Sequence, residues 1–367
     1  MKVAVITRHA ITNYGSLLQA FATQKVIENL GYSCEIIDYI REDEAYTRQE
    51  KTLLAGKNSW NSNLIKKILY LILRQPESIL AGKKFEKERE KYLNLSRHYN
   101  SINELSESGT FADVYMVGSD QVWGPVMDGT YDSAYCLAFV DDEVKKISYA
   151  SSFGRSEMTS EKKKFFLKWL SRFDHISVRE ESAVKLLNEM GFDAAQVLDP
   201  TLLLDRSFWD AYAEPIEEKK YVLVYQLHND PKLGAYAKNI ARYMNLPLIR
   251  VSVFLHQIKR EGKLIWTPSI GQFLSYVKNA TCMVTDSFHG TAFAINYNTP
   301  FIEILPNNAT GTRNINILKM TGLSDRILHD YEDITLASKE IDFANANYVL
   351  EKERKYSVQI LEKMISS

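Results

Sequence analysis

The sequence contains little cysteine and almost no excess of charge. Its 367 residues include three cysteines, Cys34, Cys136 and Cys282, which are widely spaced and odd in number. They form neither a disulfide framework nor a paired zinc motif, so we expect a reducing, cytoplasmic compartment. The 45 Lys and Arg residues balance 46 Asp and Glu residues, leaving a formal net charge of −1. This balance gives no global attraction to nucleic acid or to an anionic membrane, and we expect no nucleic-acid partner.

Long hydrophobic runs are also missing. No uncharged apolar stretch reaches the roughly 18 residues that a membrane span requires, and residues 3–6 are too short an apolar run for a signal peptide. The nearest candidate, residues 64–73, is interrupted by Lys66 and Lys67. It fits a basic amphipathic helix lying on a membrane, or a surface helix that packs its Leu and Ile side chains on the protein body. We favour the second interpretation, and expect membrane contact to be peripheral at most, at the inner face.

The common motifs for nucleotides, metals and hydrolytic nucleophiles are absent. The sequence has no G-x-G-x-x-G, no P-loop, no H-E-x-x-H and no G-x-S-x-G. Asp38 ends a predicted strand, where dinucleotide enzymes place a ribose-binding acid, but without the glycines a capping role is the simpler interpretation. Six histidines lack the spacing of metal ligands: His9, His98, His175, His228, His256 and His329. We therefore expect neither a metal site nor a cofactor.

What is present indicates an α/β protein with two domains. Predicted strands and helices alternate along most of the chain, which is typical of parallel sheets with right-handed crossovers. The length also exceeds the roughly 250–300 residues at which single cores usually divide. We expect two Rossmann-like domains facing a cleft: residues 1–205, with a helical insertion at about 41–110, and residues 206–345. A C-terminal helix, 346–367, is expected to pack back on the first domain.

The first forty residues form one predicted β-α-β unit. Residues 3–6 are a strand, and the following helix is expected to start near Ser16, which forms a capping box with Gln19 three residues later. Gly31 ends that helix, and residues 34–38 form the next strand.

The segment GSDQVW at residues 118–123 follows another predicted strand, at the sheet edge where α/β proteins bind ligands. Carboxylate, amide and aromatic groups together form a common sugar-binding surface, and Asp120 is a candidate general base. The candidates for binding a sugar acceptor are Asn13, Tyr14, Ser119, Gln121 and Trp123. The alternative, a capped turn beside a core tryptophan, fits the composition equally well.

The segment TDSFHGT at residues 285–291 is the strongest local pattern. A strand ends within it and a helix begins near Gly290, so His289 lies at a helix N-terminus. Free backbone N–H groups and the positive end of the helix dipole attract phosphate or carboxylate there, and favour a neutral imidazole that can accept a proton. His289 is therefore the candidate acid/base residue, and Ser287, Gly290 and Thr291 are candidate anion ligands. The alternative is a histidine buried for hydrogen bonding.

Two arginines are candidates to complete an anion site. Arg179 directly follows a predicted strand, and Arg313 follows Gly311-Thr312 in a predicted loop. The guanidinium group matches carboxylate and phosphate oxygens bidentately. Taken singly, either arginine is more often a surface ion-pair partner.

Six segments, taken in order, resemble the polysaccharide pyruvyl transferase family. They are residues 3–6 with NYGSLLQA (13–20), VGSDQVW (117–123), SYASSFG (148–154), SVRE (177–180), DPTLL (199–203) and TDSFHGT (285–291). Each segment alone is weak, whereas six in order at similar spacing make a specific match over nearly the whole chain.

The resemblance implies a GT-B fold, with phosphoenolpyruvate as donor and a sugar as acceptor, free or lipid-linked. Pyruvate is transferred to two sugar hydroxyls as a cyclic ketal, and phosphate is released. By similarity, His289 matches the family's acid/base histidine and Arg179 its donor-binding arginine. Some members carry another Arg two residues before the histidine, where this chain has Ser287, and Arg313 is the candidate to replace it. A nucleotide-sugar glycosyltransferase and a non-catalytic sugar-binding relative are the alternatives, because fold alone does not decide function.

Overall fold

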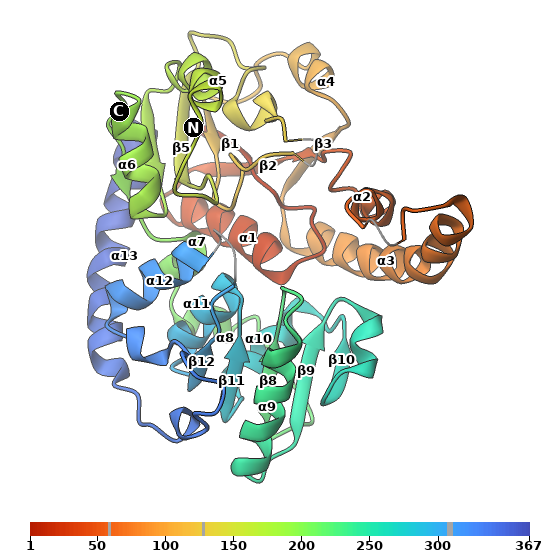
Figure 1. The fold of residues 1–367 in the computed structure, drawn as a ribbon. Helices are drawn as coiled ribbons and strands as arrows, with labels where there is room; N and C mark the ends of the chain where they lie inside the picture. Colours follow the sequence, from red (N-terminus) through yellow and green to blue (C-terminus); the bar gives the residue numbers. More distant parts are fainter. Residues whose placement is uncertain (58–59, 127–128, 307–310) are drawn as a thin grey trace. The chain divides into compact units, whose positions relative to one another are not determined.

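The computed structural model describes residues 1–57, 60–126, 129–306 and 311–367. The chain divides into two compact units (Figure 1). Met1–Pro200 and Val358–Ser367 form the first unit, and Thr201–Ser357 form the second. Each unit is built on one parallel sheet with helices packed on it.

The first unit contains a seven-stranded sheet with the order β3-β2-β1-β4-β5-β6-β7. Its strands are β1 (Lys2–Ile6), β2 (Ser33–Tyr39), β3 (Leu95–Tyr99), β4 (Val114–Val117), β5 (Lys145–Ser151), β6 (His175–Val178) and β7 (Ala195–Gln196). All neighbours are parallel. The central strand β4 is buried along its whole length, which explains its unbroken apolar sequence.

The helices of the first unit are α1 (Tyr14–Asn29), α2 (Gln49–Ala55), α3 (Leu64–Tyr92), α4 (Ile102–Glu107), α5 (Ser160–Leu170), α6 (Glu181–Glu189) and the 3₁₀ helix η1 (Ser133–Cys136). The expected capping box at Ser16 is wrong. Asn13, which has an extended backbone, caps α1 by accepting a hydrogen bond from the Gly15 N–H at 2.8 Å. Ser16 lies inside the helix and donates its hydroxyl proton to Asp120 instead. Gly31, with φ +86°, follows the end of the helix as expected.

The segment expected to be a helical insertion also contributes a strand. Helices α2, α3 and α4 lie within residues 41–110, but β3 pairs in parallel with β2 at the edge of the sheet, with Leu95 opposite Ile36. An edge strand has one solvated side, and β3 carries exposed Arg97 and His98. Its sequence therefore lacks the apolar character that identified the central strands.

The favoured interpretation of residues 64–73, a helix that packs its Leu and Ile side chains on the protein body, is wrong. The side of α3 that packs against the protein carries Tyr70, Ser78, Ala81 and Phe85. The Leu and Ile side chains of the first half of α3 are exposed instead, and Ile65 reaches 79% exposure. Across the described residues, no helix combines the length and apolar character needed to cross a bilayer.

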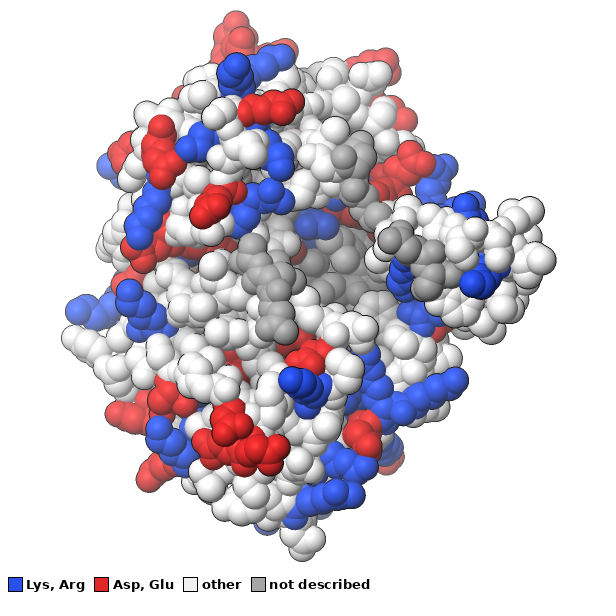
Figure 2. Space-filling model, viewed as in Figure 1, with Lys and Arg blue, Asp and Glu red and all other residues white. Residues whose placement is uncertain are grey.

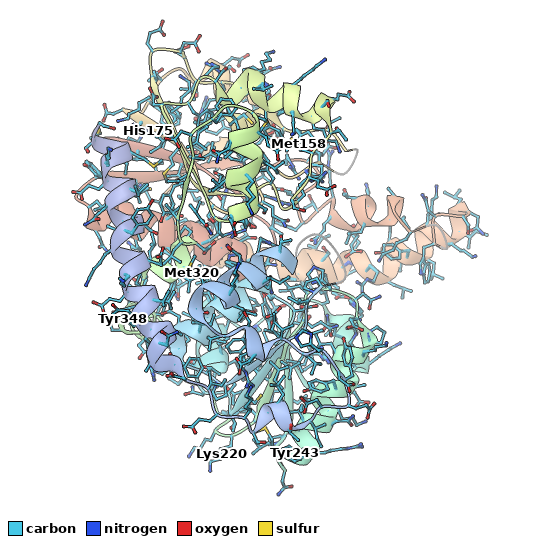
Figure 3. The ribbon with its side chains drawn as sticks, turned by 60° about the vertical axis from the view of Figure 1, so that its left-hand side comes forward. Met158, His175, Lys220, Tyr243, Met320 and Tyr348 are labelled. Atoms are coloured by element: carbon cyan, nitrogen blue, oxygen red, sulfur yellow. The ribbon has the colours of Figure 1, made fainter. Side chains whose placement is uncertain are left out.

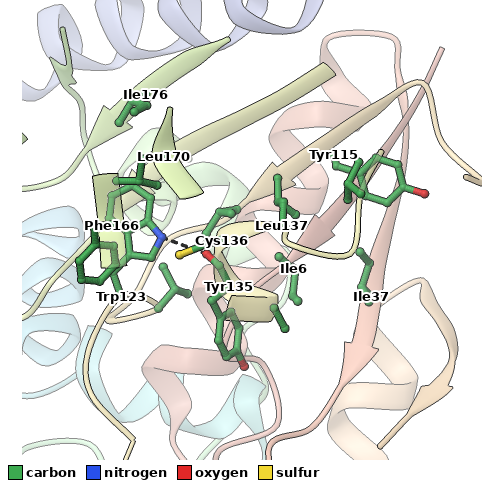
Figure 4. Close-up of a cluster of buried hydrophobic side chains, with 14 of the residues drawn as sticks. Ile6, Ile37, Tyr115, Trp123, Tyr135, Cys136, Leu137, Phe166, Leu170 and Ile176 are labelled. Atoms are coloured by element: carbon green, nitrogen blue, oxygen red, sulfur yellow. Dashed lines mark hydrogen bonds between the residues drawn. The ribbon is translucent and has the colours of Figure 1, made fainter. Parts of the chain in front are cut away.

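The core of the first unit is rich in aromatic residues (Figure 4). The Trp123 ring lies 5.0 Å from that of Phe153, and Phe153 lies 4.9 Å from Phe166 of α5. The Trp123 indole N–H donates to the carbonyl oxygen of Tyr135 at 2.9 Å (Figure 4). This cluster holds the segment after β4 against the sheet.

The second unit contains a five-stranded parallel sheet with the order β10-β9-β8-β11-β12. Its strands are β8 (Val222–Tyr225), β9 (Leu248–Ser252), β10 (Lys263–Trp266), β11 (Cys282–Thr285) and β12 (Phe301–Glu303). Its helices are α7 (Pro200–Leu203, starting at the boundary), α8 (Arg206–Asp210), α9 (Pro231–Tyr243), α10 (Ile270–Lys278), α11 (Phe288–Tyr297), α12 (Gly311–Thr321) and the 3₁₀ helices η2 (Leu255–Lys259), η3 (Ser324–Arg326) and η4 (Thr335–Ala337). Strand β10 lies at the edge of this sheet, and α12 begins at Gly311.

The last helix, α13 (Phe343–Ser366), supplies residues to both units. Its residues from Val358 onward belong to the first unit. There, the Lys145 ammonium donates to the carbonyl of Ile365 at 3.1 Å. The ring of His175, at the start of β6, lies 2.9 Å from the hydroxyl of Ser367. Figure 3 labels His175 among the side chains of the first unit.

Candidate active site

Both sheets carry polar side chains where their strand order reverses. In the first unit the reversal lies between β1 and β4, so the segments involved are residues 7–13 and 118–124. In the second unit it lies between β8 and β11, and the segments are residues 226–230 and 286–290. Crossovers run to opposite sides of the sheet at such a point and leave a crevice that commonly binds ligands.

Asp120 lies at the first of these points and is 8% exposed. It has φ +76°, a left-handed conformation that is uncommon for a residue with a side chain. Its carboxylate accepts the Ser16 hydroxyl and the Gln121 N–H, each at 2.8 Å. Gly118 enables this turn, because a Cβ there would lie 3.0 Å from that of Thr7. The loop after β4 and the first turn of α1 therefore hold the carboxylate together.

Arg8 is a charged residue at this edge that sequence reasoning missed. Its Nε donates to Glu44 at 2.6 Å, and its Nη1 lies 3.4 Å from the carbonyl oxygen of Gln121. Burial acts to lower the pKa of Arg8, but Glu44 and Asp120 outweigh it and raise that pKa. Arg8 is thus a cation beside Asp120. Its position two residues after β1, similar to that of Arg179 after β6, is the signal that could have identified it.

Arg179 lies at the same sheet edge, in a buried ion-pair network. Its Nη1 donates to Asp199 at 2.7 Å and its Nε to Glu180 at 3.2 Å. Burial acts to lower the pKa of Arg179, whereas Glu180, Asp199 and Asp120 raise it above the usual value. The two carboxylates hold the guanidinium in place, and its contact with a donor stays a prediction.

Two aromatic residues expected to contact a sugar lie in the core. Trp123 is 1% exposed and its indole N–H is bonded to Tyr135, so the core interpretation is correct and the acceptor interpretation is wrong. Tyr14 is also 1% exposed, and its ring lies 5.0 Å from that of Phe85. Neither ring has a face available for stacking on a sugar.

The other predicted acceptor residues lie at the β1–β4 edge in different environments. Ser119 is fully buried and donates to Asp199 at 2.9 Å, which disagrees with direct acceptor contact. Asn13 is occupied as the cap of α1. Gln121 is half-buried and lies over Gly154, where a Cβ would come within 2.7 Å of its amide nitrogen. Asn13 and Gln121 remain candidates for acceptor contact.

In the second unit, His289 occupies the first turn of α11, as expected. The helix begins at Phe288, and the side chain of Ser287 caps it by accepting the Gly290 N–H at 3.2 Å. Gly290 must be glycine, because a Cβ would lie 2.6 Å from the Thr285 hydroxyl. His289 is 6% exposed. Ser287 and Gly290 thus build the turn that positions the imidazole, and their direct contact with a donor stays a prediction.

Arg313 lies beside this turn, on the ring of Phe288, the residue next to His289. Its guanidinium is 5.7 Å from the centre of the Phe288 ring, and that ring is 5.2 Å from the His289 ring. Arg313 is half-buried in the first turn of α12, so the expectation of a loop there was wrong. Cation–π contact holds an arginine in one orientation without neutralising its charge.

Asp286 connects the segments that follow β8 and β11, where the strand order of the second sheet reverses. Its carboxylate accepts the backbone N–H groups of Leu227 at 2.7 Å and of His228 at 2.9 Å. The His228 ring nitrogen Nδ1 lies 3.3 Å from the same carboxylate. A second imidazole therefore lies at this edge, held by a buried acid. Sequence reasoning missed both roles because the partners are distant along the chain.

Glu303, at the end of β12, is fully buried beside the same helix start. It contacts the Thr291 hydroxyl and accepts the Asn314 amide at 2.5 Å. Burial raises the pKa of Glu303 well above its usual value, and the two hydrogen bonds only partly oppose this. The Thr291 hydroxyl has one proton, and it donates this proton to the Ser287 carbonyl at 3.0 Å. A protonated Glu303 can then donate to the Thr291 oxygen, which satisfies the contact between the two side chains.

The first unit also contains a cavity of about 960 Å³ beside the ends of β2 and β3. Three basic side chains line it, Arg41, Arg48 and Lys51, together with Tyr39 and Asp132. A second cavity, of about 610 Å³, is lined by Asp38 and Arg89 among others. The predicted site residues line neither cavity. Within the described parts of the chain, no group of three or more His, Cys, Asp or Glu residues is placed to hold a metal ion.

A family model for polysaccharide pyruvyl transferases matches residues 13–308. The chain belongs to the polysaccharide pyruvyl transferase family. Membership of this family implies that the protein is a transferase with a polysaccharide acceptor. No curated protein matches the sequence.

Solved structures with similar architecture show the fold of this family member. A Listeria monocytogenes protein, provisionally assigned as a UDP-N-acetylglucosamine 2-epimerase, has a TM-score of 0.55 at 11% identity, with 100% of this chain and 96% of that chain covered. The UDP-GlcNAc 2-epimerase of Methanocaldococcus jannaschii has a TM-score of 0.52 at 14% identity, with 92% of each chain covered. Arabidopsis thaliana UGT89C1 complexed with quercetin has a TM-score of 0.51 at 11% identity, with 99% of each chain covered. The predicted fold, two Rossmann-like parallel-sheet domains of the GT-B type, is confirmed.

Proposed function

We propose that the protein transfers a pyruvyl group from phosphoenolpyruvate to two hydroxyls of one sugar in a cell-surface or exopolysaccharide precursor, forming a cyclic ketal. One observation carries the proposal: His289 lies on the first turn of α11, where the strand order of its sheet reverses, and Arg313 lies over the ring of the neighbouring Phe288. An acid/base group next to a cation is what an enol phosphate requires. Membership of the family supports the same reaction.

The reaction needs one proton delivered to carbon and one returned to oxygen. Protonation of the methylene carbon of phosphoenolpyruvate makes the neighbouring carbon electrophilic, and a sugar hydroxyl adds to it. Phosphate then leaves, and a second hydroxyl closes the ketal. The two hydroxyl protons balance the step, because one ends on the new methyl group and the other on phosphate. No oxidant, reductant or cofactor is required.

His289 is our candidate for moving these protons. The N-terminal turn of α11 and Arg313 provide positive charge for the phosphate and carboxylate of the donor. His228, whose ring nitrogen Nδ1 lies 3.3 Å from the Asp286 carboxylate, is a second imidazole at the same edge of the sheet. A neutral Glu303 keeps an additional negative charge away from this anion site.

In the first unit, Asp120 is our candidate for accepting a proton from the acceptor hydroxyl. Ser16 and the Gln121 N–H orient its carboxylate, and Arg8 balances its charge. Arg179 interacts electrostatically with Asp120 and, as a candidate donor ligand, lies in the ion-pair network at the same sheet edge. Asn13 and Gln121 are the polar side chains left to contact the sugar.

Replacing His289 tests the proposal. We expect His289→Ala to lower the rate of phosphate release from phosphoenolpyruvate by ~10²–10⁴-fold, which is the usual contribution of a general acid/base. The measurement is phosphate released in the presence of a panel of hexose-containing oligosaccharides. His329→Ala, at an exposed histidine of the same unit, is the matched control and should react at the wild-type rate. An unchanged rate in His289→Ala would remove this residue from the mechanism.

A further inference from the structure

The first half of α3 presents an apolar stripe to solvent. Six large side chains are 46% to 79% exposed: Leu64, Ile65, Ile68, Leu69, Ile72 and Leu73. They follow one another at the three- and four-residue spacing of a helix face. Contiguous exposed apolar surface of this kind marks an interaction site rather than an ordinary surface.

The opposite face of α3 already has its partners. The Tyr70 hydroxyl donates to Glu50 of α2 at 2.6 Å and accepts from Lys57 at 2.8 Å. The Gln75 amide donates to the Thr47 carbonyl at 2.7 Å. Gly82 packs so closely on Tyr46 that a Cβ would overlap its ring. These contacts fix the orientation of α3, so the apolar stripe points away from the protein because the helix is anchored on its other side.

Charge on this half of α3 is of one sign. Between Leu64 and Gln75 the sequence contains Lys66, Lys67 and Arg74 and no acidic residue. Among the described residues, no ion pair is formed by Lys66 or Lys67. Exposed Leu and Ile side chains together with lysines on the same half-helix are the features of helices that lie in the interface of an anionic bilayer.

The figures show the same arrangement. Helices α2 and α3 extend from the sheet of the first unit as an arm (Figure 1). In Figure 2 the visible face of this arm is mainly uncharged, with several Lys and Arg side chains on it.

We propose that this apolar stripe docks α3 on an anionic lipid surface, with the helix parallel to the bilayer and its Leu and Ile side chains inserted between the head groups. A second copy of this chain fits less well. A two-fold contact through the stripe would bring the lysines of both copies into one interface, with no carboxylate on this half of α3 to balance them. The proposal is independent of the reaction above, because α3 carries none of the predicted site residues.

Vesicle flotation of the full-length protein tests the docking. We expect binding to vesicles of phosphatidylcholine with phosphatidylglycerol, weaker binding to phosphatidylcholine alone, and loss of binding as salt is raised. The triple variant Ile65→Ser, Ile68→Ser, Ile72→Ser should bind at least ~10-fold more weakly, because each change removes apolar surface from the stripe. Lys66→Ser with Lys67→Ser should remove most of the preference for anionic vesicles.

Ile258→Ser is the matched control, because Ile258 of η2 is 64% exposed but lies outside the stripe. It should float like the wild type, and circular dichroism should show that every variant is folded. Absence of binding to anionic vesicles, or equal binding by the triple variant, would overturn the proposal. So would sedimentation showing a wild-type dimer that the triple variant breaks while neither protein binds vesicles, since the stripe would then be an interface between copies.

Discussion

Glu303 illustrates how burial of one residue shapes the candidate site. Its carboxyl is fully buried at the end of β12 and connects α11, through Thr291, with α12, through Asn314. Burial raises its pKa well above the usual value, which favours the protonated carboxyl in the folded protein. A neutral acid here organises two helix starts without repelling an anionic donor.

This protonation predicts a specific pH dependence of stability. Because the pKa of Glu303 is raised in the folded state, the folded protein holds a proton that the unfolded chain releases above about pH 4.5. The protonated Glu303 carboxyl therefore contributes fully to the free energy of unfolding below about pH 4.5, and this contribution is lost as the pH rises. Glu303→Gln, which keeps the shape without titrating, should therefore gain stability over the wild type between pH 5 and pH 8. Urea unfolding at several pH values measures this difference.

The control for this experiment is Glu340→Gln, at an exposed glutamate of the same unit. Its stability relative to the wild type should be the same at pH 5 and pH 8. A difference between Glu303→Gln and the wild type that is constant over this range would show that Glu303 is ionised in the folded protein.

Single residues were predictable where one segment holds all the necessary information. His289 lies where a strand end, a glycine and a helix start follow one another, and its position at the start of α11 is confirmed. Trp123 was ambiguous, because the same composition suits a sugar platform and a core, and only contact with Phe153 and Phe166 decides it. Arg8 was missed because its partner Glu44 is 36 residues away.

Among the elements, helix α1 helps to position Asp120 at the edge of the first sheet. Asn13 caps this helix, while Ser16, inside the first turn, reaches across to Asp120. The two side chains therefore have separate tasks, one within the helix and one between segments that are 104 residues apart in sequence.

The capping assignment predicts the effect of substitutions at Asn13. Asn13→Ala should lower the free energy of unfolding by about 1 kcal/mol, because the Gly15 N–H loses its acceptor. Asn13→Ser should restore most of this loss, since serine is also a good N-cap residue. Chemical denaturation measures both changes. Equal stability of the wild type and Asn13→Ala would mean that the side chain of Asn13 does not stabilise the helix.

Elements were predictable where burial makes a strand or helix distinctive in sequence. The buried strands β1, β4 and β11 are continuous apolar runs and were expected. The edge strands β3 and β10 were not, because solvent on one side removes the apolar pattern. Helix α3 was expected from its period, but the period does not tell which side of the helix faces the protein.

The whole chain repeats one plan in its two units. Each sheet reverses its strand order once, and each reversal carries ionisable side chains: Arg8 and Asp120 in one unit, Asp286 and His289 in the other. The fold class followed from the alternation of strands and helices, and the family followed from the order of six short segments. The net charge of −1 did not indicate an anion site, because a sum over the whole chain does not show where individual charged groups lie.

The most direct test of the central claim is calorimetric titration of the full-length protein with phosphoenolpyruvate, compared with UDP-N-acetylglucosamine under the same conditions. We predict saturable binding of phosphoenolpyruvate, weakened in Arg313→Ala, which removes the cation over the Phe288 ring. We predict no binding of the nucleotide-sugar. Saturable binding of UDP-N-acetylglucosamine, with none of phosphoenolpyruvate, would contradict the account and identify a glycosyltransferase instead.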